Sequence, residues 1–204
     1  MAPPATSSDL RARNLARNQA EVADVALRLF SERGFDQVTI DDIAAEAGIS
    51  RRTFFRYFDA KEDALLPHED EVLGRFRALL DERPADEPIL LTVRRATVTL
   101  MADALAADRE ATIQRMRLVQ DIPAVYARSL EHRSYWEIAV RDLIAEHLGV
   151  DPTTSLVSTV TAAAAVGAAR AATDVWLADG ATGELADYVA AAYDLLAAGP
   201  VGPD

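Results

Sequence analysis

Two short helices joined by a tight turn are the feature that most constrains the fold of this chain. In the stretch "VTIDDIAAEAGIS", Thr39 stands three residues before Asp42, which resembles a capping box with Asp in place of the usual Glu. The helix that starts there has room for about two turns before Gly48 ends it. Ser50 then caps a second short helix. The spacing predicts a helix-turn-helix, in which the second helix is free to enter a groove.

Helical patterns account for the rest of the chain. A first amphipathic helix that Gly34 ends is predicted by apolar residues at Val22, Val25, Ala26, Leu29 and Phe30. A longer helix is expected to begin at "AKEDALL" and to be kinked by Pro67. Further helices are expected at 88–106, 109–120, 123–148, 152–178 and 183–198. Since no alternating strand pattern is present, the expected fold class is all-α, with an N-terminal three-helix helix-turn-helix domain and a C-terminal helical bundle.

The charge of the chain is unevenly distributed. A formal net charge of −12 by itself argues against nucleic acid as a partner. Residues 1–61, however, contain nine Lys plus Arg and nine Asp plus Glu, so 21 − 9 = 12 basic and 33 − 9 = 24 acidic residues follow them. All of the net charge therefore lies after Lys61. Residues 50–61 carry four basic residues and one acidic residue, and this positive island coincides with the second short helix.

The residues of that second helix, 51–58, separate into two faces at 100° per residue. Phe54 and Phe58 fall on one face, where we expect them to anchor the helix. The opposite face carries Arg52, Thr53 and Arg56, and the flanks carry Phe55 and Tyr57. A solvated basic face is one interpretation, although two arginines four residues apart repel each other. The other is a DNA-reading face, since guanidinium groups bind guanine edges and phosphates.

Several classes of protein are disfavoured. The chain has no cysteine and three scattered histidines, so neither a disulfide nor a metal site is expected. It contains no nucleophile motif and no Gly-rich phosphate loop, so we expect neither an enzyme nor a cofactor. The N-terminus lacks the apolar core of a signal peptide, which favours the cytoplasm. The apolar run 156–177 contains Arg170 and Asp174, and we expect a helix buried nearly all round rather than a membrane span.

Residues 14–66 resemble the N-terminal DNA-binding domain of the TetR family of bacterial transcriptional regulators. The resemblance rests on "ALRLFSERGFDQVTIDDIAAEAGIS" and on "RRTFFRYFDAKEDALL". It implies DNA contacts from Thr39, Arg51, Arg52, Thr53, Phe55, Arg56, Tyr57 and Lys61, of which Thr39 and Lys61 correspond to phosphate-binding positions. Arg52 stands where many members have a small residue, and Phe55 stands where many have a tyrosine that binds a phosphate.

The resemblance also implies a domain organisation. We expect a flexible basic arm at 1–13, the helix-turn-helix domain at 14–60, a helical ligand-binding and dimerisation domain at 61–199, and a tail at 200–204. The last two helices would form a homodimer, which suits a near-palindromic double-stranded DNA operator. The stretch "LLPHEDEVLGRFRALL" is similar to family members related to the mycofactocin-system regulator. That similarity implies a C-terminal domain for acyl-CoA-like ligands.

A ligand pocket needs apolar walls with few polar groups. Bulky or adaptable residues in the middle of the expected helices could line one, although core packing is an alternative role for each: Met101, Leu105, Met116, Tyr126, Trp136, Val140, Leu143, Val166, Thr173 and Trp176. Arg170 could anchor an anionic group of a ligand or could pair with Asp174.

These features together predict a ligand-responsive DNA-binding transcriptional regulator. We expect a repressor that a small apolar or acyl-CoA-like effector releases from its operator, by favouring a conformation with badly spaced reading helices. The alternative is an architectural DNA-binding protein without a ligand, for which broad basicity would be expected.

Overall fold

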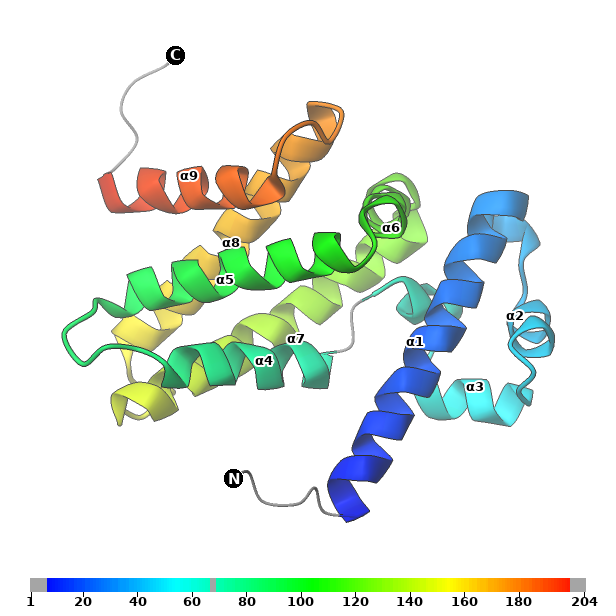
Figure 1. The fold of residues 1–204 in the computed structure, drawn as a ribbon, viewed down its shortest axis with the longest axis horizontal. Helices are drawn as coiled ribbons and strands as arrows, with labels where there is room; N and C mark the ends of the chain where they lie inside the picture. Colours follow the sequence, from blue (N-terminus) through cyan, green and yellow to red (C-terminus); the bar gives the residue numbers. More distant parts are fainter. Residues whose placement is uncertain (1–6, 67–68, 199–204) are drawn as a thin grey trace. The chain divides into compact units, whose positions relative to one another are not determined.

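The computed structural model describes residues 7–66 and 69–198, and within them the chain is all-helical, as predicted. The helices in chain order are α1 (Ser7–Arg33), η1 (Phe35–Gln37), α2 (Ile40–Glu46), α3 (Arg51–Tyr57), η2 (Lys61–Leu65), α4 (Glu69–Asp81), α5 (Ile89–Ala107), α6 (Arg109–Asp121), α7 (Pro123–Leu148), α8 (Leu156–Ala178) and α9 (Leu185–Ala198) (Figure 1). The two elements labelled η are single 3₁₀ turns.

The chain divides into two compact units. The N-terminal unit comprises residues up to 68 together with residues 118–129, and the C-terminal unit comprises 69–117 and 130–204. The expected boundary at 60/61 is therefore wrong for η2, because Ala64 and Leu65 are fully buried in the N-terminal unit. Residues 118–129 also join that unit, where Arg128 forms a bidentate contact with Asp63 (Nε–Oδ1 2.7 Å and Nη2–Oδ2 3.2 Å).

The start of α1 differs from the flexible arm expected at 1–13. The helix already begins at Ser7, so residues 7–13 are helical, while residues 1–6 lie outside the described part of the chain. After Pro4 the sequence is free of glycine and proline up to Gly34 and rich in Leu, Ala and Arg. These strong helix formers extend the helix backwards from its anchored half.

The long helix expected from "AKEDALL" is interrupted. Lys61–Leu65 form only the 3₁₀ turn η2, and α4 begins at Glu69. Leu66 between them is extended, with φ −97° and ψ 148°. A residue before proline is sterically disfavoured in the helical region, which accounts for the break; Pro67 and its expected kink lie outside the described residues.

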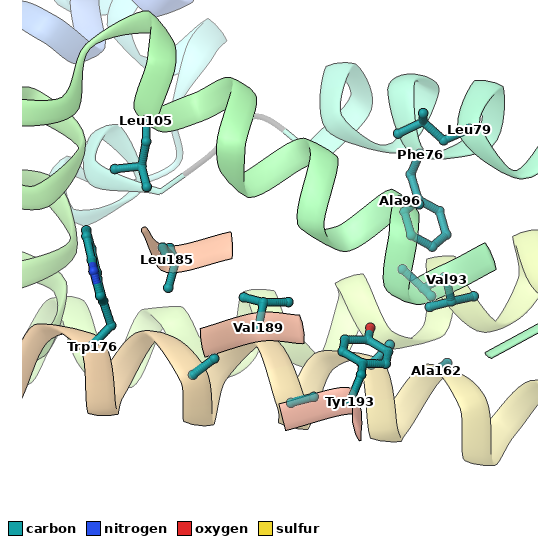
Figure 2. Close-up of a cluster of buried hydrophobic side chains, with 14 of the residues drawn as sticks. Phe76, Leu79, Val93, Ala96, Leu105, Ala162, Trp176, Leu185, Val189 and Tyr193 are labelled. Carbon is teal, nitrogen blue, oxygen red and sulfur yellow. The ribbon is translucent and has the colours of Figure 1, made fainter. Parts of the chain in front are cut away.

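The C-terminal unit is built around a core contributed mainly by α5, α8 and α9 (Figure 2). Trp176 and Tyr193 are the largest side chains buried there, and Val93, Ile144 and Leu185 are fully buried with them. Small alanines on α8, such as Ala162, leave room for these bulky side chains. By contrast, α6 fully buries none of its residues.

Helix α8 has one buried and one exposed face, so the expectation that it is buried nearly all round is wrong. Its buried face carries Ala162, Ala165, Ala168 and Trp176. Its exposed large side chains are Leu156, Val157, Val160 and Val175. By length and composition it could cross a membrane, and it is the one helix of the described residues that could; 33% of its most apolar stretch is buried. An exposed apolar face of this kind is a candidate interaction surface.

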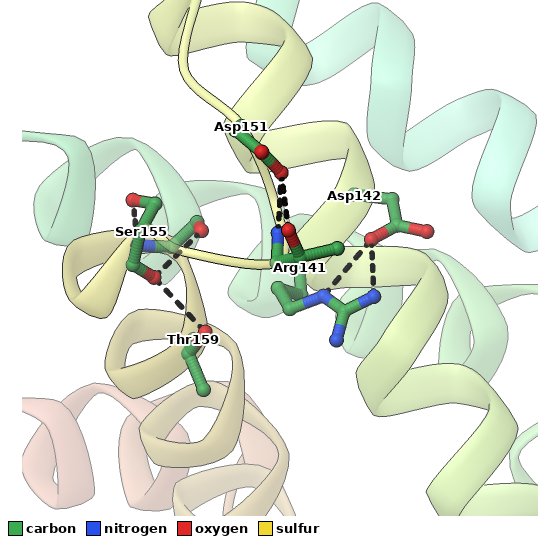
Figure 3. A network of polar contacts seen from close by, with 7 residues as sticks. Arg141, Asp142, Asp151, Ser155 and Thr159 are labelled. Atoms are coloured by element: carbon green, nitrogen blue, oxygen red, sulfur yellow. Dashed lines mark hydrogen bonds and ion pairs between the residues drawn. The ribbon is translucent and has the colours of Figure 1, made fainter.

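Local side-chain hydrogen bonds fix the corner between α7 and α8 (Figure 3). The Asp151 carboxylate accepts from the amide (2.8 Å) and the hydroxyl (2.7 Å) of Thr153, and these bonds lower the pKa of Asp151. Ser155 caps α8 by accepting from the Ser158 amide at 3.2 Å. The helix expected from residue 152 therefore begins only at Leu156, because these residues bond the backbone as a turn and a cap.

Replacing Tyr193 by Phe tests the polar contact inside this core. The Tyr193 hydroxyl lies 3.0 Å from that of Thr97, so its loss should lower the free energy of unfolding by about 1 kcal/mol. Burial raises the pKa of Tyr193 to about 12, and the Thr97 hydrogen bond offsets part of this rise. Because the pKa is higher in the folded state, the stabilisation is complete below a pH of about 10 and is lost as the pH rises towards about 12. Urea unfolding near pH 8 and near pH 11 should show a smaller alkaline loss for Tyr193→Phe than for wild type; equal losses would contradict the assignment.

Candidate nucleic-acid interface

Reciprocal hydrogen bonds define the start of α2. The Thr39 hydroxyl accepts from the Asp42 amide at 3.2 Å, and the Asp42 carboxylate accepts from the Thr39 amide at 2.8 Å. The predicted capping box is thus confirmed. The hydroxyl and the amide of Thr39 both hold the pKa of Asp42 below its usual value. Two amides at the helix start are thereby satisfied, and the threonine side chain stays on the surface.

The turn between α2 and α3 requires a glycine. Gly48 has a φ of +67°, in the left-handed region that side chains rarely adopt. The Ala47 amide donates to the Ile43 carbonyl and the Ile49 amide donates to the Ala44 carbonyl, both at 2.9 Å. One residue later the Ser50 hydroxyl accepts from the Thr53 amide at 3.0 Å and caps α3. The sharp reversal and the two caps fix the direction in which α3 leaves the turn.

Helix α3 is anchored by the aromatic side chains predicted to face inward. Phe54 is fully buried and Phe58 is 5% exposed, and their ring centroids lie 5.2 Å apart. Phe55, on the flank, meets Phe54 edge to face at 5.9 Å and is 44% exposed. The two-faced arrangement predicted for residues 51–58 is therefore present in the structure.

The outward residues of α3 form one surface. Arg52, Thr53, Phe55 and Arg56 line a shallow recess along the helix. Arg52 is exposed and, within the described residues, has neither an ion-pair nor a hydrogen-bond partner. Its guanidinium is thus available to a ligand. This planar, cationic group suits a guanine edge or a phosphate.

The other two arginines of α3 are already held. Arg51 pairs with Asp41 of α2 at 2.9 Å, and its guanidinium lies 5.3 Å from the centre of the Phe55 ring. Arg56 donates to the Tyr57 hydroxyl at 3.1 Å and stacks over that ring at 5.1 Å. Both remain exposed, so these contacts orient the two charges and do not bury them.

Lys61 differs from the rest of the predicted DNA-contact residues. It lies on η2 and is partly buried, and its ammonium donates to the Phe35 carbonyl at 2.9 Å and to the Val38 carbonyl at 3.1 Å. The same ammonium lies 4.0 Å from the centre of the Phe35 ring. The remaining seven residues all lie on α3 or at the start of α2.

Sequence reasoning missed the partners that hold this surface. Asp41 was not singled out, although it lies ten residues before Arg51, and the spacing of a helix-turn-helix brings the two helix starts together. The Gln19 side chain donates to the Tyr57 carbonyl at 3.4 Å and so ties α1 to the end of α3. Arg128 reaches Asp63 across 65 positions of sequence. Neither of the last two contacts has a local sequence signal.

The candidate pocket residues do not form a single group. The C-terminal core contains, or is packed by, Met101, Leu105, Met116, Trp136, Val140, Leu143 and Trp176. Val166 and Thr173 are half-buried on α8. Tyr126 belongs to the other compact unit, the N-terminal one. Arg170 is exposed and pairs with Asp174 at 2.8 Å, which confirms the expected alternative of an i,i+4 pair.

Comparison with known proteins supports the two-part organisation. Residues 22–66 match the family model "Bacterial regulatory proteins, tetR family", and residues 87–200 match the model "MftR C-terminal domain". The mycofactocin biosynthesis transcriptional regulator MftR of Mycobacterium tuberculosis is 31% identical over 181 residues, which cover 87% of this chain and 88% of that protein. The regulator TcmR of Streptomyces glaucescens is 31% identical over 147 residues, covering 70% of this chain and 65% of the relative.

Solved structures share the fold. FadR of Thermus thermophilus, a TetR-family transcriptional repressor, superposes with a TM-score of 0.56 at 24% identity, over 91% of this chain and 96% of the other. A TetR-family regulator from Syntrophomonas wolfei gives a TM-score of 0.60 at 19% identity, over 92% and 98% of the two chains. Two family models, a relative matched over most of its length and the geometry of α2 and α3 agree. The chain belongs to the TetR family of bacterial regulatory proteins and is a helix-turn-helix transcriptional regulator with an MftR-type C-terminal domain.

Proposed function

We propose that this regulator is a homodimeric repressor that binds a near-palindromic operator and is released from it by an acyl-CoA-like effector. The observation that carries the proposal is the outward surface of α3, where exposed cationic side chains stand on a helix anchored from behind by Phe54. We propose a cytoplasmic location, where bacterial operator DNA lies, and regulation by release needs no catalytic step. An architectural role without a ligand is not favoured, because the MftR-type domain occupies residues 87–200.

The proposed DNA contact of each side chain depends on whether that side chain is already paired within the protein. Arg52, which is unpaired among the described residues, is the main base-reading residue, and Thr53 and Arg56 lie beside it along the recess. Arg51, which Asp41 holds, and the flanking Tyr57 are assigned to the phosphate backbone, and Phe55 supports Arg51 with its ring. Thr39 adds a contact at the start of α2, where the helix end favours an anion.

The exposed face of α8 is the proposed dimer surface. Leu156, Val160, Ala163, Gly167 and Ala171 recur at helical spacing on that face, and α9 adds exposed Leu195 and Leu196. The small residues allow a second helix to approach closely, and a second copy would cover side chains that water otherwise surrounds. A two-fold dimer presents two reading helices to successive turns of a duplex, about 34 Å apart.

The proposed effector class follows from the C-terminal unit. FadR of Thermus thermophilus was crystallised with lauroyl-CoA, and FadR of Bacillus subtilis, 17% identical to this chain, with stearoyl-CoA. The apolar residues around Trp176, together with Met101, Leu105, Met116, Trp136, Val140, Leu143, Val166 and Thr173, supply walls of the kind an acyl chain needs. An effector that prefers a conformation with badly spaced reading helices shifts the population away from DNA.

Replacing Arg52 by Ala should lower the affinity for a specific duplex by about 1–3 kcal/mol and relax base choice at one position of each half-site. The specific duplex is obtained by selection from random sequence, and binding is measured by fluorescence anisotropy on that duplex and on a scrambled one. Arg75→Ala, which removes an exposed arginine of the C-terminal unit paired with Asp103, is the matched control and should leave both affinities unchanged. Equal losses on both duplexes for Arg52→Ala would rule out base reading.

Placing a charge on the α8 face should disrupt the dimer. Val160 is 55% exposed, and Val160→Glu would put a carboxylate into an apolar interface, where burial of an unpaired charge is costly. Val150→Glu, at an exposed valine between α7 and α8, is the control. Analytical ultracentrifugation should find wild type and Val150→Glu dimeric and Val160→Glu monomeric. A dimeric Val160→Glu protein would move the interface elsewhere.

Titration with lauroyl-CoA should release the protein from its selected duplex, whereas coenzyme A alone should not. The two tryptophans, Trp136 and Trp176, both belong to the proposed binding region, so intrinsic fluorescence reports binding independently of DNA. Lauric acid as a third arm separates recognition of the chain from recognition of the thioester-linked nucleotide. Fluorescence that lauroyl-CoA leaves unchanged would exclude this effector class.

A further inference from the structure

Lys61 is the only lysine of the chain. All the other residues among its 21 Lys plus Arg are arginines. Arginine supplies every cationic side chain of the reading helix, at Arg51, Arg52 and Arg56. A contact to phosphate alone does not require lysine, because guanidinium groups bind phosphate at least as well. The use of a lysine at this one position therefore needs another reason.

The surroundings of Lys61 supply that reason. The ammonium donates to two carbonyls, those of Phe35 at 2.9 Å and Val38 at 3.1 Å, and lies 4.0 Å from the centre of the Phe35 ring. These three groups converge on one point. A compact ammonium with freely directed hydrogens satisfies all three, whereas a planar guanidinium presents its donors in a fixed fork. The side chain is partly buried, which strengthens each of these contacts.

The two carbonyls lie at the entrance of α2. Phe35 packs on Phe30 of α1 with ring centroids 4.9 Å apart, and Val38 is 1% exposed. Val38 directly precedes Thr39, whose hydroxyl and amide form the capping box. Any movement of the Val38 carbonyl therefore carries the start of α2 with it.

The other end of the same side chain is fixed just beyond α3. Lys61 opens η2, whose preceding amide, that of Ala60, donates to the Asp63 carboxylate at 2.9 Å. Arg128 holds the same carboxylate, and Phe58 anchors the chain three residues before Lys61. The ammonium thus bridges the segment that enters α2 and the segment that leaves α3, across 23 and 26 positions of sequence.

We infer that Lys61 is a positioning residue for DNA binding: its ammonium fixes the entrance of α2 against the exit of α3 and thereby sets the spacing of the phosphate-facing and base-facing residues. This inference rests on the proposed DNA-binding function, and it replaces the phosphate contact implied by the family resemblance. An ammonium that bound a phosphate would have to release its backbone acceptors, whereas a positioning residue keeps them in the free and in the bound protein.

Amine labelling tests the inference without any variant. The one other amine of the chain is its N-terminus, so reductive methylation followed by mass spectrometry reports on Lys61 with an internal reference. We expect Lys61 to react several-fold more slowly in the native protein than in urea. The labelling rate of the native protein should be the same with and without the selected duplex. A Lys61 that reacts freely in the native protein and becomes protected only by DNA would overturn the inference.

Two variants separate positioning from a phosphate contact. Lys61→Met keeps the stem and removes the charge; we expect a lower melting temperature, weaker binding to the selected duplex and an unchanged slope of log K against log salt. A slope reduced by about 0.9 at an unchanged melting temperature would indicate a phosphate contact instead. Lys61→Arg keeps the charge and serves as the second variant if Lys61→Met does not fold. It should fail to restore wild-type affinity; full rescue would contradict the inference.

Tyr193→Phe, a variant destabilised in the other unit, is the control for an effect of lowered stability on DNA binding. All affinities are measured at a temperature at which circular dichroism shows each variant to be fully folded. Tyr193→Phe should then bind the selected duplex as wild type does, and Lys61→Met should not. If wild type binds no duplex, the proposed DNA-binding function fails, while the labelling rates still decide whether Lys61 is held by its carbonyls.

Discussion

The burial of Phe54 is the interaction on which the reading surface depends. A helix of seven residues is too short to be stable by itself in water. Helix α3 persists because Phe54 is enclosed by the N-terminal unit, Phe58 follows it, and Ser50 caps its first turn. With one face fixed in this way, the opposite face is free to carry repelling arginines. The arrangement of Arg52 and Arg56 on the surface is therefore a consequence of the aromatic packing behind them.

The local part of this architecture could be predicted from the sequence, because its determinants lie within a few residues of one another. The Thr39–Asp42 box, the glycine turn and the alternation of faces along α3 are all encoded at short spacing. The beginning of α1 could not be predicted from the sequence, since basic and small residues are as compatible with a helix as with a flexible arm. The break after η2 has a local cause: a residue before proline disfavours the helical region, so the chain becomes extended at Leu66 and does not continue as one kinked helix.

Long-range contacts account for what sequence reasoning could not provide. The acceptors of Lys61 are backbone carbonyls, which every residue has, so no side-chain pattern marks them. The Arg128–Asp63 pair assigns residues 118–129 to the N-terminal unit, although a boundary at 60/61 suits the local pattern. Helix α8 shows a third kind of ambiguity. An alanine-rich composition suits a core, a membrane span and a subunit interface alike, so the division of α8 into a buried and an exposed face became visible only in the structure.

The use of arginine throughout the reading helix has a consequence for regulation. Lysine acetylation modifies amines, and guanidinium groups are not its substrates. Acetyl transfer to lysine can therefore not neutralise Arg51, Arg52 or Arg56. Repositioning of the anchored helix, by contrast, changes the occupancy of this surface without any change of its charge.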